Sequence, residues 1–164
     1  MPREATPDDV ARIRRVAERG WNAAYEDSLS QRTIDTALAN FYDPAATRAA
    51  IESDDGVFLV AEREGRVVGY VMGDPADDPG VATLGAIYVA PSRWGEGIGS
   101  ALLGAFEDWC RDRGYDALRF RVLAENDVGR SFYRSHGYEA VDERETALFG
   151  ESVRELVFRG SVQS

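Results

Sequence analysis

Lysine is absent from this chain of 164 residues, in which every basic side chain is an arginine apart from the single histidine, His136. The phosphate-binding P-loop needs a lysine after its second glycine, and Schiff-base and pyridoxal-phosphate enzymes need a lysine nucleophile. Protein kinases also hold their nucleotide phosphates with a lysine on a strand. The missing lysine therefore excludes each of these classes of enzyme.

Cysteine and long apolar runs are equally scarce. Cys110 is the only cysteine, so no internal disulfide can form. One cysteine with one histidine does not suffice for a typical zinc site. No apolar run approaches the roughly 20 residues that cross a bilayer, and the N-terminal stretch MPREATPDDV has no apolar signal-peptide core. We therefore expect a cytoplasmic protein with no bound metal and no membrane partner.

Positive charge is also in short supply. Acidic residues outnumber basic ones by 29 to 19, which gives a formal net charge of -10 at pH 7. Because binding to phosphate backbones needs clustered Lys and Arg, this balance argues against nucleic acid as a partner. The simplest interpretation is a solvated acidic surface. Adaptation to a salt-rich cytoplasm is compatible with the same composition, because salt screens self-repulsion, and a GC-rich genome would equally explain arginine in place of lysine.

The chain length fits one domain, residues 1–164, with a core of its own. Helical spacing begins near the N-terminus, where Gly20 is expected to bend or interrupt the first helix. Later runs read as strands, with a tight turn at Glu64-Gly65. The predicted helices cover residues 6–27, 30–41, 43–53, 97–113 and 126–137, and the predicted strands form a hairpin over 56–75 and single strands over 81–91, 116–124, 138–148 and 151–160. This order indicates a mixed α/β sheet layered with helices.

The helix that starts near Gly97 has the strongest local pattern. Apolar residues recur along it at helical spacing and form one continuous face: Ile98, Ala101, Leu102, Ala105, Phe106, Trp109 and Cys110. We expect Cys110 to be a small buried residue on this face rather than a reactive thiol. Gly114 is expected to end the helix.

Three glycines alternate where this helix starts, at Gly95, Gly97 and Gly99. The N-terminus of a helix leaves backbone N–H groups unpaired and carries partial positive charge. Glycines let that backbone come close to a bulky anion, such as a pyrophosphate, because no Cβ atom intervenes. A tight strand-to-helix turn is the simpler alternative, although it needs one or two glycines. The spacing is not the dinucleotide-binding fingerprint, whose third glycine would fall on Ser100 or Leu102.

Two stretches, IYVAPSRWGEGIGSALL and LAENDVGRSFYRSHGYE, together resemble the motifs of the GCN5-related N-acetyltransferase (GNAT) superfamily, over about residues 56–159. The resemblance implies an α/β (α+β) fold, with a mixed, mostly antiparallel central sheet of about six to seven strands flanked by helices. It also implies acetyl-CoA-dependent transfer of an acetyl group, by direct attack, to a primary amine of a small molecule, peptide or protein. Another acyl-CoA donor, a hydroxyl acceptor and a non-catalytic acyl-CoA-binding module stay open as alternatives, as does a homodimer.

The cofactor site follows from the same resemblance. Backbone N–H groups from about Gly95 to Ser100 would cradle the pyrophosphate of acetyl-CoA. The strand ending at Val89 would pair with the pantetheine arm and place a backbone N–H near the acetyl carbonyl. Trp94 stands where the family has Gln or Arg. This difference weakens the case for a role of the Trp94 side chain in cofactor binding, but not the case for the backbone N–H groups. The residues implied to bind the cofactor are Ile87, Tyr88, Val89, Trp94, Gly95, Glu96, Gly97, Ile98, Gly99, Ser100, Asn126 and Tyr133.

The second motif implies one catalytic residue. Tyr133 would be the general acid that protonates the departing thiolate, a role that suits a phenol with an ordinary pKa of about 10. Asn126 would hydrogen-bond the pantetheine arm, and its position also predicts a helix N-cap. His136 is expected to have a structural role at the C-terminal end of this helix, where a cation is favoured.

No general base stands out in the sequence. Many GNAT enzymes have a glutamate early in the third strand, where this chain has Thr83. The base must then act through water or come from elsewhere, and Glu26 and Asp27 are two candidates that we do not assign as catalytic.

The acceptor pocket is outlined only by aromatic residues near the N-terminus. Trp21, Tyr25, Phe41 and Tyr42 would line an apolar slot, although aromatic residues at helical spacing are more often core. The acidic surface would attract a cationic amine at low salt.

Overall fold

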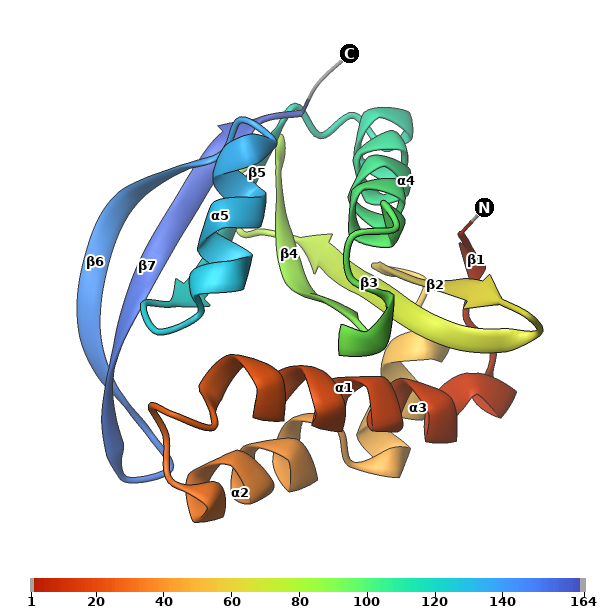
Figure 1. The fold of residues 1–164 in the computed structure, drawn as a ribbon. Helices are drawn as coiled ribbons and strands as arrows, with labels where there is room; N and C mark the ends of the chain where they lie inside the picture. The colour runs from red at the N-terminus through yellow and green to blue at the C-terminus, as the bar shows by residue number, and fades with distance from the viewer. Residues whose placement is uncertain (1, 163–164) are drawn as a thin grey trace.

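The computed structural model describes residues 2–162, which form one seven-stranded sheet with helices on both faces (Figure 1). The strands are β1 (Arg3–Glu4), β2 (Val57–Arg63), β3 (Arg66–Pro75), β4 (Val81–Val89), β5 (Ala117–Leu123), β6 (Glu139–Leu148) and β7 (Glu151–Ser161). The helices are α1 (Val10–Tyr25), α2 (Gln31–Phe41), α3 (Pro44–Glu52), α4 (Ile98–Asp112) and α5 (Asp127–Ser135), with short 3-10 turns η1 (Pro7–Asp9) and η2 (Pro91–Arg93). The predicted fold class is confirmed. No helix in the described part of the chain is long and apolar enough to cross a membrane.

Local sequence explains where helices α2 and α3 begin. The Ser30 hydroxyl accepts a hydrogen bond from the backbone N–H of Thr33 and caps α2, and an Asp43 carboxylate oxygen caps α3 in the same way. Pro44 follows at the first helical position, where a missing N–H costs nothing. Gly20 does not interrupt α1, which runs without a break from Val10 to Tyr25.

The sheet has the strand order β1-β2-β3-β4-β5-β7-β6 and is antiparallel except between β4 and β5. These two parallel strands pair only from Val81 to Thr83. Just beyond, the pairing of β4 with β3 shifts by one residue at Gly85. A bulge of this kind bends a strand and increases its twist. The bulge therefore coincides with the point at which β4 and β5 separate, in the middle of the sheet.

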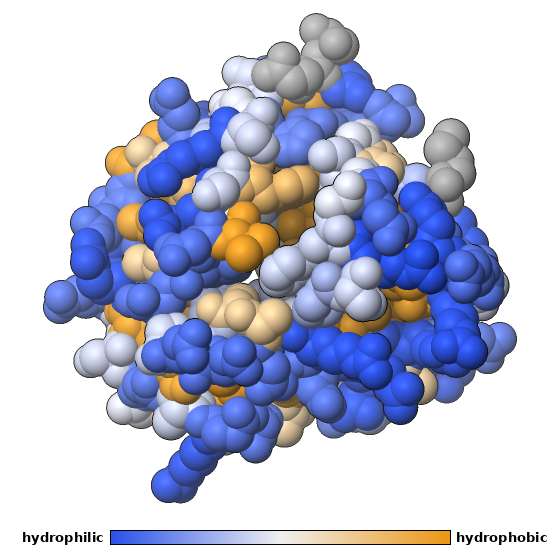
Figure 2. Space-filling model, viewed as in Figure 1, coloured by the Kyte–Doolittle hydropathy of each residue, from blue (hydrophilic) through white to orange (hydrophobic). Residues whose placement is uncertain are grey.

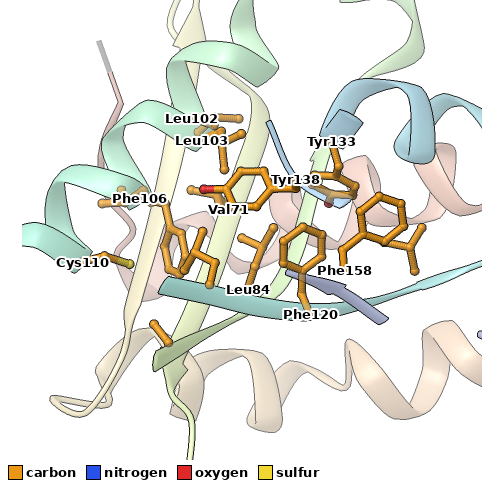
Figure 3. Close-up of a cluster of buried hydrophobic side chains, with 14 of the residues drawn as sticks. Val71, Leu84, Leu102, Leu103, Phe106, Cys110, Phe120, Tyr133, Tyr138 and Phe158 are labelled. Carbon is orange, nitrogen blue, oxygen red and sulfur yellow. The ribbon is translucent and has the colours of Figure 1, made fainter. Parts of the chain in front are cut away.

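Helices cover both faces of this sheet and bury two separate apolar clusters. Helices α4 and α5 lie on one face, and α1 and α2 lie on the other (Figure 1). The cluster beneath α4 and α5 includes Phe106, Phe120, Tyr133 and Phe158 (Figure 3). The cluster on the α1 side includes Ile13, Trp21, Tyr42 and Tyr70, and the chain therefore has two cores separated by the sheet.

The buried face of α4 differs slightly from the predicted one. Leu103 is fully buried, whereas Ala101, which was assigned to the face, is exposed. The remaining predicted residues are buried or partly buried, and Cys110 is fully buried as expected. The face is thus rotated toward Leu103, because the sheet meets the helix on that side.

Strand β1 was not predicted. It consists of only two residues, which pair with Leu59 and Val60 of β2, and two residues are too few to show an alternating pattern. The Arg3 guanidinium holds this edge in place through the carboxylates of Asp9 and Glu62. These contacts hold the pKa of Asp9 below its usual value.

Candidate active site

A cavity of about 810 Å³ lies where β4 and β5 separate. Its walls come from both sides of the sheet, with α1 and the end of α2 on one side and α4 and α5 on the other. Apolar side chains gather around a hollow in the middle of the face seen in Figure 2, above α1. The gap in the sheet therefore joins two compartments, which we call the glycine-loop half and the aromatic half.

The glycine-loop half is built by the turn between η2 and α4. Gly95 and Gly97 have φ angles of +86° and +81°, in the left-handed region that favours glycine. A Cβ atom at either position would meet no atom within 4 Å, so this side of the loop is open. Gly97 is the N-cap of α4, and no side chain caps the helix. The first N–H groups of α4 therefore lack a partner within the helix and are suited to bind an anion.

Gly99 has a different reason to be glycine. It lies in the first turn of α4 with ordinary helical backbone, and a Cβ atom there would lie 3.2 Å from Cε1 of Phe132 on α5. Gly99 thus lets α4 and α5 approach each other. Phe132 also lines the cavity. It was not among the predicted site residues, although it directly precedes Tyr133.

The loop before Gly95 is fixed by its own side chains. The Trp94 indole N–H donates to the backbone carbonyl of Val89 at 3.0 Å, which ties the loop to the end of β4. Arg93 faces the carboxylates of Glu64 and Glu96, at 3.7 and 3.6 Å. Every residue predicted to bind the cofactor lines the cavity except Glu96, whose side chain is exposed.

Tyr133 reaches the cavity from α5 and is only 6% exposed. Its ring packs against Phe120, with 4.6 Å between ring centroids (Figure 3). Burial raises the pKa of Tyr133, so the phenol stays protonated and is available as a donor. Asn126 lines the cavity about two helical turns earlier, and its side-chain oxygen accepts a hydrogen bond from Gly129 N at 2.8 Å. The predicted N-cap is confirmed.

The four aromatic residues predicted for the acceptor pocket all line the aromatic half. Trp21, Tyr25 and Tyr42 are also buried core residues, whereas Phe41 is 51% exposed. The Tyr70 hydroxyl donates to the Tyr42 hydroxyl, and burial raises the pKa of Tyr42 to about 12.

Tyr25 and Tyr88 both line the cavity. Burial raises the pKa of Tyr25, and hydrogen bonds to Tyr88 and Asn126 offset part of that rise. Burial also raises the pKa of Tyr88, on β4. The aromatic half is therefore walled by neutral phenols at physiological pH.

The candidates for a general base do not meet this cavity. Glu26 and Asp27 are exposed beyond the end of α1 and do not line it. Thr83 pairs with β3 and β5 within the sheet and does not line it either.

Glu155 on β7 is the one carboxylate among the described residues that line the cavity. Sequence reasoning missed it, together with its neighbour Arg121 on β5. A signal was present in SVRELVF, where a glutamate interrupts the alternating positions of Val153 and Val157, both of which are buried.

His136 and Cys110 do not line the cavity. His136 is the C-cap residue of α5, as expected, and its Nε2 lies 3.0 Å from the Ser100 hydroxyl of α4. Its ring also packs on Phe132, at 4.6 Å between centroids, so it links the two helices beside the cavity. Burial raises the pKa of Cys110 to about 12, so that this thiol is not a reactive nucleophile at neutral pH.

A model of the acetyltransferase (GNAT) family matches residues 13–138. The chain belongs to this family. The matched residues span both motifs and the elements from α1 to the end of α5, and so include both halves of the cavity except the part contributed by β6 and β7.

Solved GNAT structures share the whole fold. The PaiA N-acetyltransferase from Thermoplasma acidophilum, in complex with coenzyme A, is 22% identical with a TM-score of 0.86, and the match covers 98% of each chain. The ribosomal-protein-alanine N-acetyltransferase from Brucella melitensis is 25% identical with a TM-score of 0.69, and the match covers 98% of this chain and 99% of that one. The uncharacterized N-acetyltransferase YhfO of Bacillus subtilis is 28% identical over 99 residues, which are 58% of this chain and 66% of the relative, just under two thirds of its length.

Proposed function

We propose that this GNAT chain is an acetyl-CoA-dependent N-acetyltransferase that acts on a primary amine of a small molecule, peptide or protein. The observation that carries the proposal is the cavity where β4 and β5 separate, which joins an uncapped helix N-terminus to Tyr133 and to an aromatic compartment. One half offers donors for an anion, and the other offers an apolar wall for an acceptor. Family membership supports acetyl transfer as the chemistry.

The chain's own residues fit acetyl-CoA. Gly95 and Gly97 leave open space beside the unpaired N–H groups of α4, which would hold the pyrophosphate. Beyond Thr83, no strand within residues 2–162 pairs with the edge of β4 that faces β5, and the pantetheine arm would lie along this edge. Bound acetyl-CoA would supply the acetyl group as a reactive thioester.

Tyr133 would serve as the general acid. Because burial raises its pKa, the hydroxyl carries its proton at physiological pH and can donate it to a departing thiolate. Among the described residues no hydrogen bond to another side chain engages this hydroxyl, so it is available to a bound group. The neutral tyrosines around it would exclude water from the reacting centre without adding charge.

Calorimetric titration of acetyl-CoA into the purified protein, at low and at multimolar salt, tests the cofactor site. We expect micromolar binding of acetyl-CoA and none of NAD or ATP. CoA release is then measured with a broad amine panel and with acetyl-, propionyl- and succinyl-CoA as donors. Binding without release for any amine would favour the non-catalytic module, and faster release from a longer donor would favour another acyltransferase. Absence of binding by the folded protein would contradict the proposed function.

A further inference from the structure

We propose that Glu155 binds the ammonium group of the acceptor and thereby makes the site selective for cationic amines that carry an apolar body. This inference rests on the proposed function and names the acceptor class for the same cavity. Glu155 is on β7, outside both sequence motifs and outside the residues that the family model matches.

The position of Glu155 places its carboxylate in the aromatic half. On β7 it is paired with Leu123 of β5, and both residues line the cavity. Val153, two residues earlier on the same face, packs into the cluster formed with α1 and α2. The Glu155 side chain is 18% exposed, so it is largely withdrawn from bulk water.

The carboxylate is poorly satisfied by its surroundings. Within residues 2–162, no hydrogen bond reaches it, and its one ion pair is with Arg121 Nη1 at 4.0 Å. Arg121 itself is 62% exposed, which makes this a weak partner. Arg144, which lies opposite Glu155 on β6, turns its Nε to Asp142 instead. A partly buried carboxylate without a close donor is strongly stabilised when a cation supplies hydrogen bonds.

The other lining charges and the apolar wall point to the same ligand. Arg93 belongs to the glycine-loop half, where it faces Glu64 and Glu96. One lining arginine thus lies at the end proposed for the pyrophosphate. The other, Arg121, lies beside Glu155 but is 62% exposed. Glu155 is the one carboxylate among the described residues that line the cavity. In the aromatic half, the walls contributed by Trp21, Phe41 and Leu148 are apolar. This combination fits an ammonium attached to a hydrocarbon chain or ring.

A matched pair of probes tests this assignment in the protein saturated with coenzyme A. The dissociation constants of 2-phenylethylamine and 2-phenylethanol are measured by calorimetry, because the two differ mainly in the ammonium group. We expect the wild type to prefer the amine, and Glu155→Gln to weaken amine binding by roughly ten- to a hundredfold, as for a lost charge-assisted hydrogen bond, with the alcohol unaffected. Glu155→Asp should show a smaller loss.

Two variants separate ligand binding from a structural role. Arg121→Gln removes the one ion-pair partner that Glu155 has among the described residues and should keep the preference for the amine. Glu145→Gln removes an exposed carboxylate from the neighbouring β6 and should change neither constant. Equal losses in Arg121→Gln and Glu155→Gln, or a wild type without preference for the amine, would overturn the inference.

Turnover distinguishes this inference from the proposed function. We expect Glu155→Gln to raise KM for alkylamines that are charged at pH 7 and to spare weakly basic amines that are neutral there. If the wild type releases no CoA with any amine, the proposed function fails while the binding result still decides the role of Glu155. If wild type and Glu155→Gln turn over charged amines equally well, only the inference fails.

Discussion

Tyr88 of β4 packs directly onto Gly20 in the middle of α1: a Cβ atom at Gly20 would lie 2.6 Å from Cδ1 of the Tyr88 ring. The Tyr88 side chain also acts on Tyr25, at the end of the same helix, where it lowers the pKa that burial raises. Both tyrosines line the cavity. Gly20 therefore sets how closely α1 approaches the strand that borders the proposed active site.

Replacing Gly20 by alanine should destabilise the protein. Alanine is the better helix former by about 1 kcal/mol in a helix interior, but the new methyl group would force Tyr88 or α1 to move, and overpacking typically costs about 1–3 kcal/mol. We expect the cost of overpacking to exceed the gain in helix propensity, so that the free energy of unfolding, measured in urea, falls by up to about 2 kcal/mol. The matched control is Gly104→Ala in α4, where a Cβ would meet no atom within 4 Å. That change should leave stability equal or higher, and the same sign for both variants would contradict this account.

Gly20 and Gly99 show which features local sequence patterns can predict and which they cannot. Spacing, caps and turn residues were enough for every α-helix and for six of the seven strands, because those signals act within one element. From the sequence, Gly20 is interpreted as a residue that bends or interrupts a helix. Its contact with Tyr88 is not visible there, because Tyr88 is far away in the sequence. The same holds for Gly99, whose partner Phe132 lies on another helix. Tertiary contacts of this kind leave no periodic signal.

In the candidate site too, residues within local motifs could be predicted from the sequence, whereas a residue brought in by the assembled sheet could not. The glycine loop, Asn126 and Tyr133 lie in compact motifs, so the sequence alone was sufficient to single them out. Glu155 lies on a strand near the C-terminus and becomes part of the cavity only because β7 inserts between β5 and β6 in the sheet. A single charged residue in an alternating strand is usually solvent-exposed, and only the assembled sheet shows this one to be largely covered.

Gly97 should tolerate asparagine better than alanine. At a φ of +81° an L-residue with a Cβ is strained by about 1–2 kcal/mol, whereas asparagine adopts left-handed backbone more readily. We expect Gly97→Ala to lower both the free energy of unfolding and the affinity for acetyl-CoA, and Gly97→Asn to lower each by less. Urea unfolding and calorimetry of both variants check this. Wild-type behaviour of Gly97→Ala in both measurements would mean that the loop does not need its left-handed backbone.

Tyr133→Phe should separate catalysis from cofactor binding. Removing the hydroxyl removes the proposed proton donor and should lower kcat by roughly ten- to a thousandfold, while the dissociation constant of acetyl-CoA changes little. The matched control is Tyr138→Phe, because Tyr138 packs on the same Phe120 ring but hydrogen-bonds Glu107 instead. That variant is expected to lose stability and keep kcat. An unchanged kcat in Tyr133→Phe, measured where the chemical step limits turnover, would remove Tyr133 from the mechanism.

The buried tyrosines should make the protein sensitive to alkali. Burial raises the pKa of Tyr25, Tyr42, Tyr88 and Tyr133 in the folded state, whereas the unfolded chain has the ordinary value of about 10. Between these values the folded state holds protons that the unfolded state has lost, so unfolding becomes more favourable as the pH rises. This stabilising contribution is complete below about pH 9 and falls above pH 10 by about 1.4 kcal/mol per pH unit for each such tyrosine.

For Tyr42 the loss extends up to its folded-state pKa of about 12. The free energy of unfolding, measured in urea between pH 8 and pH 12, should therefore decline steeply at the alkaline end. Most of the rise in tyrosinate absorbance should accompany global unfolding, because burial raises the pKa of these phenols in the folded state. A double variant, Tyr42→Phe with Tyr70→Phe, removes one hydrogen-bonded pair as a unit and should show a shallower decline. Titration of these tyrosines near pH 10 in a protein that remains folded would show that their hydroxyls are open to water.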